Sequence, residues 1–381
     1  MAHMIENNMM AYVGAKPWHG LGFEVPVGAT GQQMLEIAGL NWLVQRRALA
    51  MRSVNPDGTV DRSTMLTAEL DSYRAIVRAD TNQVFQVASD RYHPVQNAEI
   101  VDFFREYCEA GHASIETMGG LRNGAVVWAL AKLNGGSTAN LSGVDELRGY
   151  MLLATSHDGS LLTIGKPTQT RVVCWNTLSA SLGLHGGKLG KIADKEFRMR
   201  HTRKFGPAER ENAQKTMGMA IEQVQATNEL AAKLSTVKID GKGRTEFVNR
   251  LLGTNAGATI ETTIKVADVD HSAMGKSILD SIILNTRIAS VQAKSTPADT
   301  EEFNRVGKAI IDAIVSSPGA NLVTAKDTLW GAVNGVTYYA DHAAKTRSDG
   351  NRLFSSWFGP NETLKRDAVT IAASMAGIAS N

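Results

Sequence analysis

The chain has 381 residues, 43% of them hydrophobic and 20% charged, and its 40 Lys and Arg nearly balance 38 Asp and Glu, leaving a net charge of +2. This composition is typical of a globular protein with room for two domains, and it excludes a wholly basic, histone-like binder of nucleic acid. No apolar run is long enough to cross a bilayer, so neither a transmembrane helix nor a membrane partner is expected.

The N-terminal sequence and the cysteines both favour a cytoplasmic protein. The segment MAHMIENNMMAYVG lacks the basic start and the apolar run of a signal peptide. The two cysteines, Cys108 and Cys174, are too few for a disulfide framework or a four-thiolate zinc site. Both stand among apolar residues, which predicts small buried side chains in a reducing compartment.

Turn-forming residues dominate residues 1–40, which predicts an N-terminal arm with one helix near Thr30–Ala38. Residues 41–205 predict a core domain of antiparallel strands with packed helices. Helical spacing of apolar residues predicts helices at Gln96–Ala110 and Cys174–Leu182. Alternating apolar residues between turn signals predict strands at Trp42–Ser53, Tyr73–Arg78, Val84–Ala88, His112–Met118, Ala125–Leu133, Leu147–Thr155 and Leu161–Val173.

Residues 206–381 predict a mostly α-helical domain, because Pro207 is a helix start signal and apolar residues then recur at helical spacing. The expected helices are Pro207–Leu234, Glu246–Leu252, Lys276–Ala293, Glu301–Val315, Ala325–Ala343 and Leu364–Ser374. The fold class is therefore α+β: an antiparallel sheet with packed helices, followed by a mostly helical C-terminal region.

Motifs for catalysis and for cofactors are missing from the sequence. The glycine-rich stretch 183–191 falls one residue short of the P-loop spacing and lacks the Ser or Thr that holds magnesium. The nine histidines are scattered, with no HExxH, and there is no GxSxG. We therefore expect no metal, no cofactor and no catalytic residue, although an enzyme assembled from distant residues such as His93, His157 and Asp158 stays open.

Clustered cations are the feature that points to a ligand. Between Lys188 and Lys204 there are seven Lys or Arg against two acids, which indicates a phosphate backbone as partner or, alternatively, a solvated linker. Neighbouring strands add further basic rows. The candidate nucleic-acid-binding residues are Arg46, Arg47, Lys166, Arg171, Lys188, Lys191, Arg198, Arg200, Arg203 and Lys204. Four aromatic residues offer stacking faces for bases or ordinary core packing, namely Trp18, Trp42, Tyr92 and Trp128.

Several segments together resemble the phage/plasmid-related family catalogued as domain of unknown function 932. They are Lys16-Pro-Trp-His-Gly-Leu-Gly22, Tyr92-His-Pro-Val-Gln96, Arg171-Val-Val-Cys-Trp-Asn-Thr-Leu178, Arg200-His-Thr202, Leu329-Trp-Gly-Ala-Val-Asn-Gly-Val-Thr-Tyr-Tyr-Ala-Asp-His342 and Trp357-Phe-Gly359. The resemblance spans nearly the whole chain. It implies an origin in a phage or plasmid, and hence the cytoplasm of a bacterial host.

The predicted order of two hairpins and a helix in residues 112–183 also resembles the β-β-β-α core of ring-forming phage annealing recombinases. This likeness is one of topology, with no diagnostic motif. It implies a protein that binds and anneals single-stranded DNA without ATP, as a homo-oligomeric ring or filament. The alternative is a phage interaction protein without enzymatic activity or nucleic-acid binding, such as an inhibitor of a host defence or a structural subunit.

Overall fold

The computed structural model describes residues 9–14, 22–62, 68–174, 176–179, 184–185, 188–189, 196–253, 297–345 and 349–378. Its centre is a nine-stranded sheet with the main order β11-β10-β9-β7-β6-β1-β2, on which β14 also pairs with β10 and β8 with β9. The strands are β1 (Met10–Val13), β2 (Phe23–Val25), β6 (Ala113–Leu121), β7 (Val126–Leu133), β8 (Ala139–Leu141), β9 (Asp145–Ser156), β10 (Thr163–Arg171), β11 (Asn176–Ser179) and β14 (Phe197–Met199).

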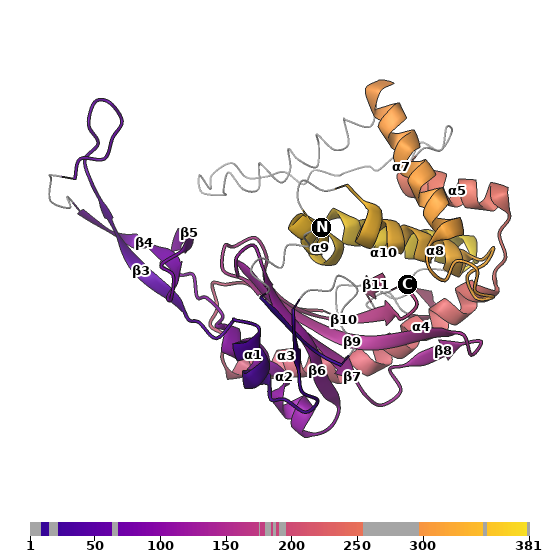
Figure 1. Cartoon of the computed structure of the whole chain (residues 1–381), viewed down its shortest axis with the longest axis horizontal. Coiled ribbons are helices and arrows are strands. Elements are labelled where there is room, and N and C mark those ends of the chain that lie inside the picture. The colour runs from indigo at the N-terminus through magenta and orange to yellow at the C-terminus, as the bar shows by residue number, and fades with distance from the viewer. Residues whose placement is uncertain are drawn as a thin grey trace, which may run out of the picture.

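Helices cover both faces of this sheet (Figure 1). On one face lie α1 (Gly31–Ile37), α2 (Asn97–Glu109) and α3 (Pro207–Gly218), and α4 (Ala220–Thr236) continues from them. On the other face lie α8 (Leu329–Tyr338), α9 (Asp349–Phe358) and α10 (Pro360–Met375). The remaining elements are α5 (Gly241–Leu252), α7 (Pro297–Ser316), the π-helix η4 (Tyr339–Ala343) and a small hairpin of β12 (Leu184–His185) and β13 (Lys188–Leu189).

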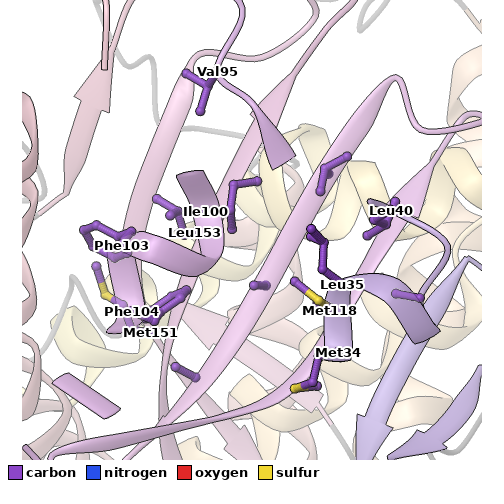
Figure 2. Packing of buried hydrophobic residues seen from close by; sticks show 14 of the residues in the cluster. Met34, Leu35, Leu40, Val95, Ile100, Phe103, Phe104, Met118, Met151 and Leu153 are labelled. Carbon is purple, nitrogen blue, oxygen red and sulfur yellow. The ribbon is translucent and has the colours of Figure 1, made fainter. Parts of the chain in front are cut away.

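The two-sided burial follows from the period-two alternation of strand side chains. Along β9, Met151 and Leu153 join the cluster under α1 and α2, whereas Leu152 and Ala154 join the cluster that holds Trp357 of α9. Figure 2 shows the first cluster, in which labelled side chains of α1 and α2 lie against Met118, Met151 and Leu153 of the sheet. Both faces of the central strands are therefore core.

The helix α4 approaches β9 closely because Gly149 has no side chain. A Cβ at this position would lie 2.6 Å from Cγ1 of Val224 and 2.9 Å from Cβ of Ser137. A larger residue here would push α4 off the sheet.

A second sheet of three antiparallel strands stands clear of this body as an arm, at the left of Figure 1. It has the order β3 (Val44–Met51), β4 (Ala68–Arg78) and β5 (Val84–Ser89). Its base is fixed to the body, since Ile76 and Trp42 are buried and the Gln96 side chain bonds both the N–H and the C=O of Val44. We call this three-stranded sheet the arm.

The α+β class, the antiparallel strands and the helical C-terminal region are confirmed. One prediction was wrong: within residues 174–182 the described residues hold β11, which pairs antiparallel with β10, in place of a helix. Asn, Thr and Ser are weak helix formers, and the edge of β10 offers them backbone partners.

The predicted helix Lys276–Ala293 lies outside the described residues. None of the helices that the structure describes is long and apolar enough to span a membrane.

Candidate nucleic-acid interface

Two of the ten predicted DNA-binding residues, Lys166 and Arg171 of β10, are buried in ion pairs. The Lys166 ammonium donates to the carbonyl of Trp357 at 2.6 Å and lies 3.4 Å from Glu362 Oε1. Arg171 binds both carboxylate oxygens of Asp145, at 2.7 and 2.9 Å. These side chains are only 4% and 2% exposed, so neither can reach a phosphate backbone. The prediction was wrong for both, because β10 is covered on both faces.

A third buried pair joins the sheet to the C-terminal helices. Lys365 of α10 lies 2.8 Å from Asp341 of η4. Both side chains also bind the backbone of Thr177. The Lys365 ammonium donates to its carbonyl at 2.7 Å, and Asp341 Oδ2 accepts from its N–H at 2.9 Å. Ser356 also donates to Asp341. Every polar atom of this network faces another protein group, which indicates a structural role.

Four predicted residues do form an exposed set, in and after β14. Strand alternation buries Phe197, Met199 and His201 against the body, so the intervening Arg198 and Arg200 face solvent. A turn follows, in which the N–H of Arg203 donates to the carbonyl of Arg200 at 3.1 Å. The exposed cations of this segment are Arg198, Arg200, Arg203 and Lys204.

These cations differ in whether their charge is compensated. Arg198 is 52% exposed and binds Glu196 at 2.6 Å. Arg200, Arg203 and Lys204 have no ion pair with any residue in the described ranges. Uncompensated exposed cations close together are what a phosphate chain requires.

Arg46 of the arm belongs to the same surface, because its side chain contacts the loop between β5 and α2. Arg46 donates to the carbonyl of Asp90, and the N–H of His93 donates to the carbonyl of His201 at 2.6 Å. The ring of Tyr92 stacks on that of His201, with centroids 4.8 Å apart. Residues 46, 90–93 and 200–204, far apart in the sequence, therefore lie side by side.

This arrangement adds two residues to the predicted nucleic-acid site, Arg91 and His93, of which the sequence had suggested only His93, and that for a possible enzyme. Arg91 is exposed on the shared loop, and His93 is half-buried beside it. Burial lowers the pKa of His93, and the charges of Arg46 and Lys204 lower it further. We call Arg46, Arg91, His93, Arg198, Arg200, Arg203 and Lys204 the basic cluster. Among the described residues, the acids nearest in the chain are Asp90, Glu196 and Glu209, and the charge of Asp158 acts on His201 beneath the cluster. The six Arg and Lys of the cluster outnumber these four acids.

The remaining predicted cations are not placed in this cluster. Arg47 follows Arg46 on β3, so its side chain starts from the opposite face, where it binds Asn82 Oδ1 at 2.7 Å and Gln45 Oε1 at 3.1 Å. The backbone of Lys188 pairs with His185 in the small hairpin. Lys191 lies outside the described residues.

The aromatic residues do not provide stacking faces for bases. Trp42, Tyr92 and Trp128 are buried, at 6%, 8% and 2% exposure, and Trp18 lies outside the described residues. Core packing is thus the correct interpretation for these three. A nucleic acid at the basic cluster would be held by its phosphates, with its bases left free.

The alternative of an enzyme built on His93, His157 and Asp158 gains no support from the geometry. His157 is fully buried against Trp42 and Phe85, and its Nε2 lies 3.0 Å from Asn97 Oδ1. Burial lowers the pKa of His157 to about 3, and the neighbouring His201 contributes to the shift. Its ring is therefore neutral near pH 7 and out of reach of a substrate. Among the described residues, no three His, Cys, Asp or Glu side chains gather in a way that would hold a metal ion.

Comparison with known proteins gives one match. The model of the family described as Domain of unknown function (DUF932) matches residues 84–357, more than half of the chain. No curated protein and no solved structure matches.

Proposed function

The chain belongs to the family described as Domain of unknown function (DUF932), and we propose that within it this protein binds and anneals single-stranded DNA without ATP, as a homo-oligomer. The observation that carries the proposal is the convergence of the arm, the loop 90–93 and the turn 200–204 on one exposed basic surface, in which Arg200, Arg203 and Lys204 form no ion pair with the residues that the structure describes. Cations there would hold the phosphate chain while the bases stay available for pairing. The phage or plasmid origin implied by the resemblance belongs to the same proposal.

Charge reversal at the turn tests the binding site. The double variant Arg200→Glu, Arg203→Glu is expected to weaken binding of a single-stranded oligonucleotide by roughly tenfold or more and to lower the salt slope of log K by about 1.4, because two phosphate contacts are lost. Fluorescence anisotropy at two salt concentrations measures both quantities. Annealing of complementary strands, followed by fluorescence quenching without ATP, should slow in parallel.

A control with the same change in net charge separates a local site from overall charge. Lys242 and Lys308 are exposed on α5 and α7, and the variant Lys242→Glu, Lys308→Glu makes the same change of four charges. We expect it to bind DNA nearly as the wild type does. Equal losses in both double variants would contradict the assignment of the site. A wild-type protein without salt-dependent DNA binding would contradict the proposed function and favour the interaction protein without nucleic-acid binding.

The arm supports the proposed assembly. It exposes three large apolar side chains at 51–56%, namely Tyr73, Val84 and Val87. The edge strand β5 carries no charged residue, and charges are the usual protection of an edge against pairing with another chain.

The double variant Val84→Asp, Val87→Asp is expected to shift the protein towards the monomer, because charges oppose both apolar contact and strand pairing. Sedimentation velocity over a range of concentrations measures the shift. The matched control is Val315→Asp, Val323→Asp, since these valines are exposed at 49% and 64% outside the arm. Unchanged assembly of the arm variant would contradict the role of the arm.

A further inference from the structure

His93 occupies a particular position within the basic cluster, because cations from two other elements act on it. Arg46 of β3 binds the carbonyl of Asp90 on the same loop, and Lys204 lies in the turn to which this loop is bonded. After burial, these two charges lower the pKa of His93, so they disfavour the protonated ring. On its own loop stand Asp90 and Arg91. Its backbone N–H donates to the carbonyl of His201 at 2.6 Å, which holds this loop against the turn.

The surroundings of the His93 ring allow it to take up or release a proton. It is half-buried, and no hydrogen bond ties it to another described residue. The rings of Tyr92 and His201 differ from that of His93, because both are buried. His201 is buried, stacked on Tyr92, and has its Nε2 2.9 Å from the carbonyl of Leu161. Burial lowers the pKa of His201 and strongly raises that of Tyr92, which keeps both rings neutral near pH 7.

We infer that His93 takes up a proton when a phosphate chain binds the basic cluster, and that this proton couples binding to pH. The inference rests on the proposed function. A bound phosphodiester offsets the field of Arg46 and Lys204, so the imidazolium becomes favourable and adds one more cation to the contact. A negatively charged ligand without a chain of phosphates would engage fewer of the cations around His93.

The direction of the pH effect follows from linkage. If the pKa of His93 is higher in the complex than in the free protein, the affinity rises as the pH falls through the pKa of the complex. It levels off once the free protein is also protonated. Each unit by which binding raises the pKa corresponds to about tenfold in affinity.

The experiment measures the affinity for a labelled oligothymidylate at constant ionic strength between about pH 8 and about pH 6, the range in which histidine titrates. Thymine does not titrate in this range. The wild type is expected to bind up to about tenfold more tightly at the lower pH. The variant His93→Gln should bind with nearly constant affinity, and His93→Arg should bind tightly at both ends. His112→Gln, an exposed histidine after α2, serves as the control and should retain the wild-type dependence.

Two results would overturn the inference while leaving the proposed function intact. One is a wild-type affinity that does not change with pH. The other is an unchanged pH dependence in His93→Gln, which would assign the proton to another group such as His201. Absence of binding at every pH would instead contradict the proposed function, and the inference with it. Thermal unfolding of each variant checks that the substitutions leave the fold unchanged.

Discussion

Replacing Asp145 with alanine is expected to destabilise the protein by about 3–5 kcal/mol, the cost of leaving a buried charge without its partner. Asp145 is fully buried at the start of β9 and holds Arg171 through two hydrogen bonds of 2.7 and 2.9 Å. Its Oδ2 also accepts from Oγ1 of Thr324 at 2.8 Å and from Nε1 of Trp330 at 3.2 Å. Without the carboxylate, four donor groups on three residues, Arg171, Thr324 and Trp330, lose this acceptor.

Urea unfolding followed by circular dichroism measures this loss. The matched control is Glu146→Ala, which removes an ion pair of 2.8 Å with Arg148 whose side chains are 38% and 30% exposed. That pair should contribute less than about 1 kcal/mol. The double variant Asp145→Ala, Arg171→Met should recover part of the loss, since the unpartnered charge is also removed. A loss for Asp145→Ala no larger than that for Glu146→Ala would contradict the argument.

The substitution Gly335→Ala is expected to destabilise the protein by about 3 kcal/mol, at the upper end of what overpacking costs. Gly335 lies on α8 where this helix crosses α7, and an added Cβ would lie 2.5 Å from Cα and 2.7 Å from the backbone N of Ile314. Because these are backbone atoms, no side-chain rotation relieves the clash, and the two helices must separate. Thermal and urea unfolding measure the effect.

Gly241→Ala is the matched control for this substitution. Gly241 begins α5, and an added Cβ there would meet only Nη2 of Arg244, at 3.8 Å. Alanine in a helix is otherwise more stable than glycine by roughly 0.5–1 kcal/mol, so this variant should be neutral or slightly more stable. Equal stability of both variants would show that α7 and α8 can separate without loss.

Most elements were predictable because their signals are local. The hairpin of β9 and β10 and the helix α2 follow from apolar periodicity and turn residues. The predicted helix near Thr30–Ala38 is α1, and the structure shows that a capping box of Thr30 and Gln33 begins it. The predicted helix Pro207–Leu234 is divided into α3 and α4 after Gly218. The predicted helix Ala325–Ala343 begins only at Leu329 and ends in the π-helix. Such boundaries depend on tertiary packing, which cannot be read from the local sequence pattern.

The candidate site was predictable only in part, because charge alone does not reveal exposure. Lys166 and Arg198 both stand on strands, yet β10 is covered by helices on two faces, whereas β14 exposes every second residue. The acid that neutralises Lys166, Glu362, is 196 residues away in the sequence, and the acid that neutralises Arg171, Asp145, is 26 residues away on the neighbouring strand. The contribution of Arg91 and His93 depends on the contact between two loops. The division of the chain near residue 205 stays a prediction.

The buried pair of Lys166 and Glu362 sets an order of events during synthesis. The two residues are 196 positions apart, so at about 5–20 residues per second Lys166 is incorporated roughly 10–40 s before its partner. Throughout that interval β10 carries a cation with no neutralising carboxylate on α10, and the face that α8, α9 and α10 later cover is open to water. The sheet can therefore complete its packing only when translation is nearly finished. A nascent chain stalled before α10 would present this polar and apolar surface to chaperones.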